Sequence, residues 1–484
     1  MFIFYLKLVK IFFAINKNIF YNKFMNKKSD FAGVFYPAEQ EELNNVLESY
    51  KQDITVDYRT KAIIVPHAGY AYSGHAAMAG FQYLEPSENI FIIGPSHHFE
   101  FNNIALPEYS YFETPLGSLE VNNKLVKDIS QKFPSVINNE FFDKEHCIEV
   151  ELPFIQNLFL PQKQSAVDFV KNLKKMGKKI KIVPILTGNC DHRLISDLIA
   201  TYWENSSFVI SSDLSHFYPQ QQCRQIDTYT ATIIETGKIN FLENAQACGV
   251  VGIKGLVDFA NNNDCSMIRS EMYNSGDISN DKERVVGYGS WFMYTDSRNE
   301  FIEKYCHDYV LEAARASILA AINQEEYIPH KIPTVLTQFG ASFVTLKTNG
   351  KLRGCIGSIY PTKPLVLDII DNAKNAAFQD PRFEPLTIDE VNNLNVSVSV
   401  LSAIERIHFK DERDLLSKIY PHGIIIIERD KRAVYLPVVW EQLPDREIFL
   451  NSLKEKAGLP PEYFSRTIEA YKFDASYITD EVEM

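Results

Sequence analysis

The stretch IFIIGPSHHFE, residues 90–100, decides the fold class of the N-terminal part of the chain. Four β-favouring residues in a row, from Ile90 to Ile93, are typical of a strand that is buried on both faces. The turn residues GPS then end the strand. His97 and His98 follow directly, so this strand is expected to present a pair of histidines at its carboxyl end.

Three further apolar runs of the same kind occur in the sequence, at residues 61–66, 180–186 and 207–212. Helix-length segments separate the runs, and this alternation predicts an α/β fold with a largely parallel central sheet. In such folds the ligand site lies beyond the carboxyl ends of the strands. Each of the four runs is followed there by polar residues suited to chemistry, namely His67, His97 with His98, Asn189, and Asp213 with His216.

The convergence of histidines predicts a metal site at this edge of the sheet. Imidazole is a good ligand for iron, copper, zinc and nickel. We expect His67 and one member of the pair, His97 or His98, to be ligands. A third donor is needed, and the residues leave four candidates open: Cys248, Asp213, His216 and His146. For each of these taken alone, the competing interpretation is a polar residue that caps an element or satisfies the core.

The motif EHCIEVELPF, residues 145–154, offers a second constellation. A helix through this motif would place His146 and Glu149 on one face, at i and i+3. Glu149 could then orient the histidine, as carboxylates orient metal-ligating imidazoles. The competing interpretation is a solvated helix on which the histidine has no role.

Composition limits the class of protein. The chain has 484 residues and a formal net charge of −13, so it lacks the cationic field that nucleic-acid binding requires. Its seven cysteines are dispersed without a CxxC motif, which is typical of a reducing compartment. We therefore expect a cytoplasmic protein of two or more domains that does not bind nucleic acid.

Residues 1–24 are apolar and aromatic, but Lys7 and Lys10 interrupt them before a membrane-spanning length is reached. Met25 opens a sequence typical of a soluble protein. We interpret residues 1–27 as an N-terminal extension, with an interfacial anchor and a signal peptide as alternatives, and expect no stable membrane insertion.

The pattern changes around residues 295–301, where the chain turns polar. Residues 301–323 then predict one long helix, Asn349-Gly350 predicts a hairpin, and the alternating residues after 395 predict strands. The stretch GIIIIERDKRAVYLP predicts a strand pair that turns through Asp430-Lys431. This second part is expected to be an α+β domain, covering residues 300–484, after a first domain at 28–296. Within it, LRGCIG combines close-approach glycines with Arg353, a candidate anion ligand, and Cys355; the competing interpretation is a tight turn with a small buried thiol.

Several of these motifs, in order, resemble known families. AIIVPHAGYAYSG, FIIGPSHH, EHCIEVELPF, VISSDLSHF and the CG at residues 248–249 resemble the Memo family, which is related in fold to class III extradiol dioxygenases. LRGCIGS, AAFQDPRFEPL and PVVWEQLPD resemble the AMMECR1 family. The combination is similar to proteins B and A of the AmmeMemoRadiSam system joined in one chain, which implies a radical SAM protein as a candidate partner.

The Memo resemblance implies a metal pocket in which His67, His97 and Cys248 are the ligands. It implies Asp213 and His216 as catalytic pocket residues, beside His146 from the motif above. Ring-cleaving relatives have a carboxylate as the third ligand, and a thiolate makes the site softer, so ring cleavage does not transfer directly. The expected cofactor is iron, with copper as the alternative.

Three functions follow as hypotheses. The first is a metal-dependent redox enzyme that acts on an unknown small molecule or peptide, with His216 as proton donor or acceptor. The second is a binding or scaffold protein that uses the pocket without turnover. The third is zinc-dependent hydrolysis, which the thiolate and the dioxygenase kinship make less favourable. For the C-terminal domain, Arg353 and Cys355 are the candidate ligand site.

Overall fold

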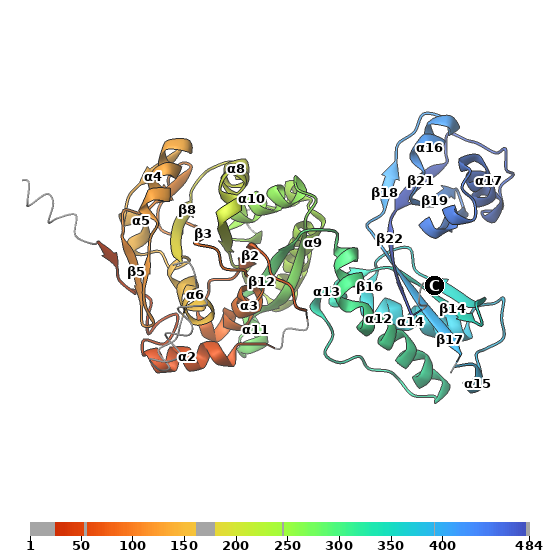
Figure 1. The fold of residues 1–484 in the computed structure, drawn as a ribbon, viewed down its shortest axis with the longest axis horizontal. Coiled ribbons are helices and arrows are strands. Elements are labelled where there is room, and N and C mark those ends of the chain that lie inside the picture. Colours follow the sequence, from red (N-terminus) through yellow and green to blue (C-terminus); the bar gives the residue numbers. More distant parts are fainter. Residues whose placement is uncertain (1–24, 53–55, 161–179, 244–245, 392, 481–484) are drawn as a thin grey trace, which may run out of the picture. The chain divides into compact units, whose positions relative to one another are not determined.

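The computed structural model describes residues 25–52, 56–160, 180–243, 246–391 and 393–480. The chain divides into two compact units, Met1–Asp296 and Ser297–Met484. Figure 1 labels the elements of both units. Residues 1–24, for which the sequence offers an extension or an interfacial segment, lie outside the described residues. Among the residues that are described, no helix is both long and apolar enough to cross a membrane.

The first unit is built on a mixed nine-stranded sheet, counted over its described residues. Four neighbouring strands run parallel, in the order β2, β9, β3, β8. They match the four apolar runs of the sequence, and the predicted α/β fold with a largely parallel sheet is confirmed. Their bounds are β2 (Ala62–Val65), β3 (Asn89–Pro95), β8 (Lys181–Thr187) and β9 (Ser206–Ser211).

Antiparallel pairing continues the sheet at both sides of this parallel block. On one side β12 pairs with β2, and both β10 and β11 pair with β12. On the other side β4 pairs with β8 in the antiparallel sense, and β7 pairs with β4. The bounds are β4 (Ile104–Leu106), β7 (Ser135–Ile137), β10 (His216–Tyr218), β11 (Ser266–Asn274) and β12 (Val285–Tyr294).

Helices cover both faces of the parallel block. A Cβ on Gly252 of α10 (Val250–Asn261) would contact Ile210, whereas one on Gly80 of α3 (Tyr70–Phe81) would contact Val65. Ile210 pairs with Ile64, the residue before Val65, and successive strand residues point to opposite faces. The two helices therefore lie on opposite faces, which explains why these strands are apolar along their whole length.

The other elements of this unit frame the sheet. A small sheet holds β1 (Asn26–Lys27), β5 (Tyr111–Thr114) and β6 (Gly117–Glu120). The remaining helices are α2 (Gln40–Ser49), α4 (Asn123–Lys132), α5 (Glu140–Asp143), η1 (Glu149–Glu151), α6 (Leu152–Phe159), α8 (His192–Tyr202), η2 (Trp203–Asn205), α9 (Gln220–Thr236), η3 (Ile239–Phe241) and α11 (Ser275–Ile278).

The second unit is α+β and rich in strands. Its long helix α12 (Arg298–Ile322) begins at a capping box formed by Ser297 and Glu300, three residues before the predicted start. Two four-stranded sheets follow, in the orders β15-β14-β17-β22 and β18-β21-β19-β20. Their strands are β14 (Ser342–Thr348), β15 (Lys351–Gly357), β17 (Leu394–Leu401), β18 (Glu405–Ile407), β19 (Gly423–Glu428), β20 (Lys431–Tyr435), β21 (Glu469–Phe473) and β22 (Ala475–Thr479).

The helix α14 (Leu365–Phe378) packs on β14 and β15 and against α12. Short elements complete the unit: α13 (Thr334–Thr337), β13 (Phe339–Gly340), β16 (Lys363–Pro364), α15 (Ile388–Val391), α16 (Glu412–Lys418), η5 (Pro437–Glu441) and α17 (Arg446–Lys456).

Two hairpin turns test the sequence interpretation of the second unit. Asn349 and Gly350 both have positive φ, at 52° and 73°, as a tight turn between β14 and β15 requires. The turn between β19 and β20 lies at Arg429-Asp430, with Arg429 at φ 59°, rather than at Asp430-Lys431 as the sequence predicts. The strand β20 starts at Lys431, which pairs with Glu428, so the turn moves one residue toward the N-terminus.

The central position of β3 leads to a stability prediction. Ile92 is fully buried in this strand, so Ile92→Ala should lower the free energy of unfolding of the first unit by about 2–5 kcal/mol through lost packing and a cavity. Urea unfolding followed by the fluorescence of Trp203 and Trp291 measures this. Ile278→Ala is the matched control, because Ile278 is 51% exposed, and its effect should stay within about 0.5 kcal/mol.

Candidate metal centre

The carboxyl ends of three adjacent strands bring the predicted site residues together. β9 lies between β2 and β3, so His67, Asp213 and His97 follow neighbouring strand ends. His146 joins them from the loop before η1. One nitrogen of each of His67, His97 and His146 lies within 4.8 Å of the others, which is close enough to share a metal ion.

The three imidazole rings are packed against one another. The ring centroids of His67 lie 5.2 Å from those of both His97 and His146, and the rings are nearly perpendicular. His97 and His146 are stacked at 4.8 Å. His97 and His98 are both exposed, but of the two only His97 belongs to this cluster of described residues.

His97 is oriented by a buried carboxylate. Glu145 accepts the backbone N–H of His97 at 2.7 Å, and its Oε1 lies 2.9 Å from His97 Nδ1. Burial alone would lower the pKa of His97, but the bond to Glu145 and its charge outweigh burial and raise it. Burial would likewise raise the pKa of Glu145, yet its contacts with His97 bring it down to about 2. Nε2 of His97 is therefore left to face the cluster.

The ring of His67 is held by a hydroxyl group, whereas that of His97 is held by a carboxylate. Its Nδ1 lies 2.8 Å from Ser211 Oγ, and Ser211 in turn donates to the carbonyl of Cys147 or to Glu151 Oε1, at 2.8 and 2.7 Å. Burial, and then the neighbouring histidines, lower the pKa of His67 well below its usual value. Glu151 is fully buried with Oε2 unpartnered, and burial raises its pKa well above the usual range. Ser211 thus holds the His67 ring through Nδ1, and His67 Nε2 lies 3.2 Å from Cys248 Sγ.

His146 is a neutral imidazole that packs against two phenylalanine rings. The rings of Phe31 and Phe35 lie 5.7 and 4.7 Å from it. Burial lowers the pKa of His146 to about 4, so at neutral pH it offers a lone pair rather than a proton. The predicted pairing with Glu149 is wrong. Glu149 accepts instead from Phe31 N at 2.8 Å and from Tyr36 Oη at 2.7 Å, and it is Glu145 that approaches His146.

Cys248 reaches the cluster from the segment before α10. Gly249 separates it from that helix, and Cys248 Sγ lies 3.2 Å from His67 Nε2 and accepts the N–H of Asp213 at 3.2 Å. A Cβ on the next residue, Gly249, would lie 2.7 Å from the carbonyl oxygen of Ser211, so a glycine is needed for this approach. Burial raises the pKa of the Cys248 thiol.

Asp213 and His216 line the same edge but do not orient each other. Asp213 Oδ1 accepts the backbone N–H of His67 at 2.9 Å, and burial raises the pKa of Asp213 to about 7. His216 donates from Nδ1 to the carbonyl of Leu214 at 2.8 Å, and burial lowers its pKa. The neutral ring of His216 therefore keeps an unprotonated Nε2, which can accept a proton.

The donor set fits a transition metal. Imidazole nitrogens and a thiolate together suit iron, copper or zinc. The carboxylate on His97 Nδ1 and the hydroxyl on His67 Nδ1 are the partners that metal-ligating histidines usually have. Asn189, which also follows a strand end, lies outside the cluster and lines a cleft beside Cys248.

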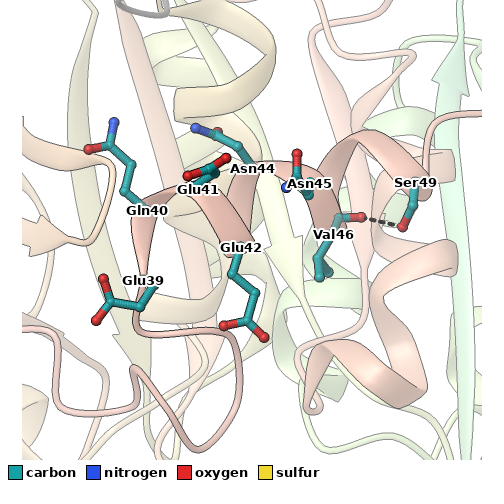
Figure 2. A pocket seen from close by; sticks show the side chains of 8 residues that line it. All are labelled: Glu39, Gln40, Glu41, Glu42, Asn44, Asn45, Val46 and Ser49. Atoms are coloured by element: carbon teal, nitrogen blue, oxygen red, sulfur yellow. Dashed lines mark hydrogen bonds between the residues drawn. The ribbon is translucent and has the colours of Figure 1, made fainter.

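A hollow of about 960 Å³ elsewhere in the first unit is unrelated to this chemistry. It runs along one helix, α2, and Figure 2 shows that its side chains are carboxylates, amides, a serine and a valine. It contains no histidine or cysteine and shares no residue with the histidine cluster. We therefore place the functional site at the sheet edge.

In the second unit the LRGCIG motif forms the strand β15 rather than a tight turn. Arg353 donates from Nε and Nη2 to Glu390 at 2.6 and 3.1 Å, and its buried Nη1 has no hydrogen-bond partner among the described residues. Cys355 donates its backbone N–H to Asp380 at 2.8 Å and accepts from Thr345 Oγ1 at 3.3 Å. A Cβ on Gly354 would lie 2.0 Å from the carbonyl oxygen of Ala376, so this glycine lets α14 pack on the strand.

A parallel sheet with a histidine and thiol cluster at its carboxyl edge defines an α/β protein with a candidate metal centre. The family model of the Memo-like protein matches residues 27–292, and that of AMMECR1 matches residues 311–478. The chain belongs to the Memo family and carries an AMMECR1 domain after the Memo domain. Membership implies an extradiol dioxygenase-like fold for the first unit.

Individual relatives match the two parts separately. A MEMO1 family protein from Aquifex aeolicus is 30% identical over 275 residues, which are 53% of this chain and 95% of that protein. A protein from Thermotoga maritima is 40% identical over 158 residues, or 31% of this chain and 86% of that protein. The crystal structure of an uncharacterized protein from Pyrococcus horikoshii is 34% identical and covers 35% of this chain and 89% of its own, with a TM-score of 0.34.

Three residues that build the site were not assigned this role from the sequence: Glu145, Ser211 and Glu151. Glu145 and Glu151 lie in the EHCIEVELPF motif, and Ser211 ends the strand run before Asp213. An acid next to His146 was a usable signal for Glu145. The bond from Ser211 to Glu151 spans 60 residues and has no local signature.

The buried Glu151 predicts a pH-dependent stability. Its folded-state pKa is raised above the ordinary value of 4.5, so the native state binds more protons than the unfolded state, and stability falls as the pH rises above 4.5. Glu151→Gln should remove this loss. Its stability advantage over the wild type should grow from pH 5 to pH 8, by at most about 1.4 kcal/mol per pH unit.

Urea unfolding of the metal-free protein at several pH values measures this difference. Glu204→Gln is the matched control, because Glu204 is exposed and its substitution should leave the pH profile unchanged. Parallel stability curves for the wild type and Glu151→Gln would mean that Glu151 is ionised in the native state.

Proposed function

We propose that the Memo domain is a metal-dependent redox enzyme acting on a small organic substrate. The observation that supports this most strongly is the convergence of His67, His97 and His146 within 4.8 Å, with Cys248 Sγ 3.2 Å from His67 Nε2. His67, His97 and Cys248 would hold the metal. His146, which was predicted as a catalytic residue, would be a further donor. Iron is the proposed metal, with copper as the alternative.

The chemistry of the donors supports a redox metal. Neutral imidazoles and a thiolate form a softer site than the two histidines and one carboxylate of ring-cleaving dioxygenases. The bound metal would supply one-electron chemistry toward O2 or an organic substrate. Because the thiolate changes the electronic properties of iron, we propose an oxidoreductase related to the dioxygenases rather than ring cleavage itself.

The protein groups around the metal have separate tasks. Glu145 fixes the ring of His97, and Ser211 fixes that of His67, through their bonds to Nδ1. His216 presents an unprotonated Nε2 and would take a proton from the substrate. Asp213 holds the chain at His67 by accepting its backbone N–H.

The AMMECR1 domain is proposed to bind the substrate or product of the Memo domain. Fusion in one chain supports a shared pathway, and the family combination supports a radical SAM protein as the partner of that pathway. Cys355, whose backbone and sulfur are both hydrogen-bonded on β15, is its candidate contact residue.

Metal retention tests the proposed function. The full chain, purified without oxygen, should retain about one iron or copper ion per chain by elemental analysis. His67→Ala, His97→Ala and Cys248→Ser should lose it, because each removes a donor, and Glu145→Gln should weaken metal affinity by about 10- to 100-fold. His98→Ala is the matched control, since it removes the neighbouring exposed histidine, and should retain the metal.

The outcomes separate the competing functions. Retention of zinc alone, with no redox metal bound after loading, would favour hydrolysis. If no metal exceeds trace level and the donor substitutions change nothing, the metal-enzyme proposal fails and a non-catalytic binding protein takes its place. His146→Ala decides whether His146, the fourth donor, is a ligand. If it is, the substitution should also weaken metal affinity; if it is not, metal affinity should stay the same.

A further inference from the structure

A cleft of about 700 Å³ opens beside the proposed metal ligand Cys248. It is lined by residues 95–96 and 99–102 after β3, residues 187–190 after β8, and the start of α10. Clefts of this size bind small organic molecules. Because Cys248 Sγ lies 3.2 Å from His67 Nε2 and also lines this cleft, a ligand here would lie next to the metal centre. We call it the β3–β8 cleft.

The apolar part of the cleft is rigid. Phe99 and Phe101 line it, and both rings pack on Phe141, at 5.2 Å and 4.8 Å between centroids. Val250 and Val251 add branched side chains from the first turn of α10. These four side chains fit an aromatic or branched apolar group of a ligand.

Two side-chain amides in the cleft remain available to a ligand. Asn102 and Asn189 form a backbone bridge, and Asn189 N donates to the Phe101 carbonyl at 2.8 Å. Their backbones are therefore fixed, while neither side-chain amide is hydrogen-bonded to another residue that the structure describes. Amides held in place without a protein partner can bind the polar groups of a ligand.

The only charged side chain among the described residues that line the cleft is negative. Glu100 is the one carboxylate that lines it, and no lysine, arginine or histidine does. An anion would therefore lose its hydration without gaining a cationic partner. An amine would gain the Glu100 carboxylate as a charged partner. The positive end of α10 would favour an anion, but the Cys248 thiol of the chain itself already lies there.

We infer that the β3–β8 cleft binds the substrate of the metal centre, and that this substrate is a small amine with an aromatic or branched apolar group. The role as a substrate site rests on the proposed redox function. The preference for an amine over a carboxylate rests on the cleft alone.

Two probes of matched shape test this inference. Phenethylamine and 3-phenylpropanoate share a ring and a two-carbon spacer and differ in charge. Calorimetric titration into the full chain, with and without bound metal, should show the amine binding about tenfold more tightly or better. Glu100→Lys should reverse this preference, and Val251→Trp should block both probes by filling the cleft.

Glu108→Lys is the matched control, because Glu108 is exposed, does not line the cleft, and changes the net charge equally. It should leave the preference unchanged. If Glu100→Lys fails to fold, Glu100→Gln, which removes the charge at nearly constant shape, should abolish the preference. Equal affinities for the two probes, or a preference that survives both Glu100 variants, would overturn the inference.

The same titrations separate this inference from the proposed function. A protein that retains a redox metal but shows no amine preference keeps the proposed function and loses the cleft assignment. A protein that holds no redox metal but binds the amine in a Glu100-dependent way loses the proposed function and keeps the cleft as a binding site for amines.

Discussion

The position of β9 between β2 and β3 is the constraint on which the candidate metal centre depends. Its parallel hydrogen bonding to both neighbours aligns three strand ends, and the polar residues that follow them have no place in a sheet covered on both faces. They collect at the carboxyl edge. The segment before α10 then brings the Cys248 thiol to within 3.2 Å of His67 Nε2. The strand order that builds the sheet therefore also assembles the site.

Electrostatics within the cluster divides three similar side chains into two kinds. His97 shares a direct bond with the Glu145 carboxylate, which favours its cation, whereas His67 and His146 are desolvated and stay neutral. Three imidazoles can therefore lie within contact distance without three like charges. Burial also raises the pKa of Glu151, which accepts from Ser211, and so disfavours a further charge beside the cluster. The donor side chains can therefore lie close together without strong charge repulsion even when no cation is bound.

Much of this could be predicted from the sequence, and the failures have physical causes. Continuous apolar runs located the four parallel strands, and the strand-edge rule placed His67, His97 and Asp213. Cys248 was one of four candidates for the third donor, and the family resemblance selected it. The pairing of His146 with Glu149 failed because residues 145–148 are not helical, so no i, i+3 face exists there. Glu149 instead binds groups more than 110 residues away, which local periodicity cannot reveal.

The order of strands in the sheet has a consequence for how the protein is made. β2 and β3 appear early in synthesis, but they are not neighbours, and the strand that separates them begins only at Ser206. Cys248 follows His67 by 181 residues. A nascent chain can therefore expose its histidines long before they share a site, and a cation captured at that stage would meet an incomplete set of donors. Maturation of the centre must wait until nearly the whole first domain has left the ribosome.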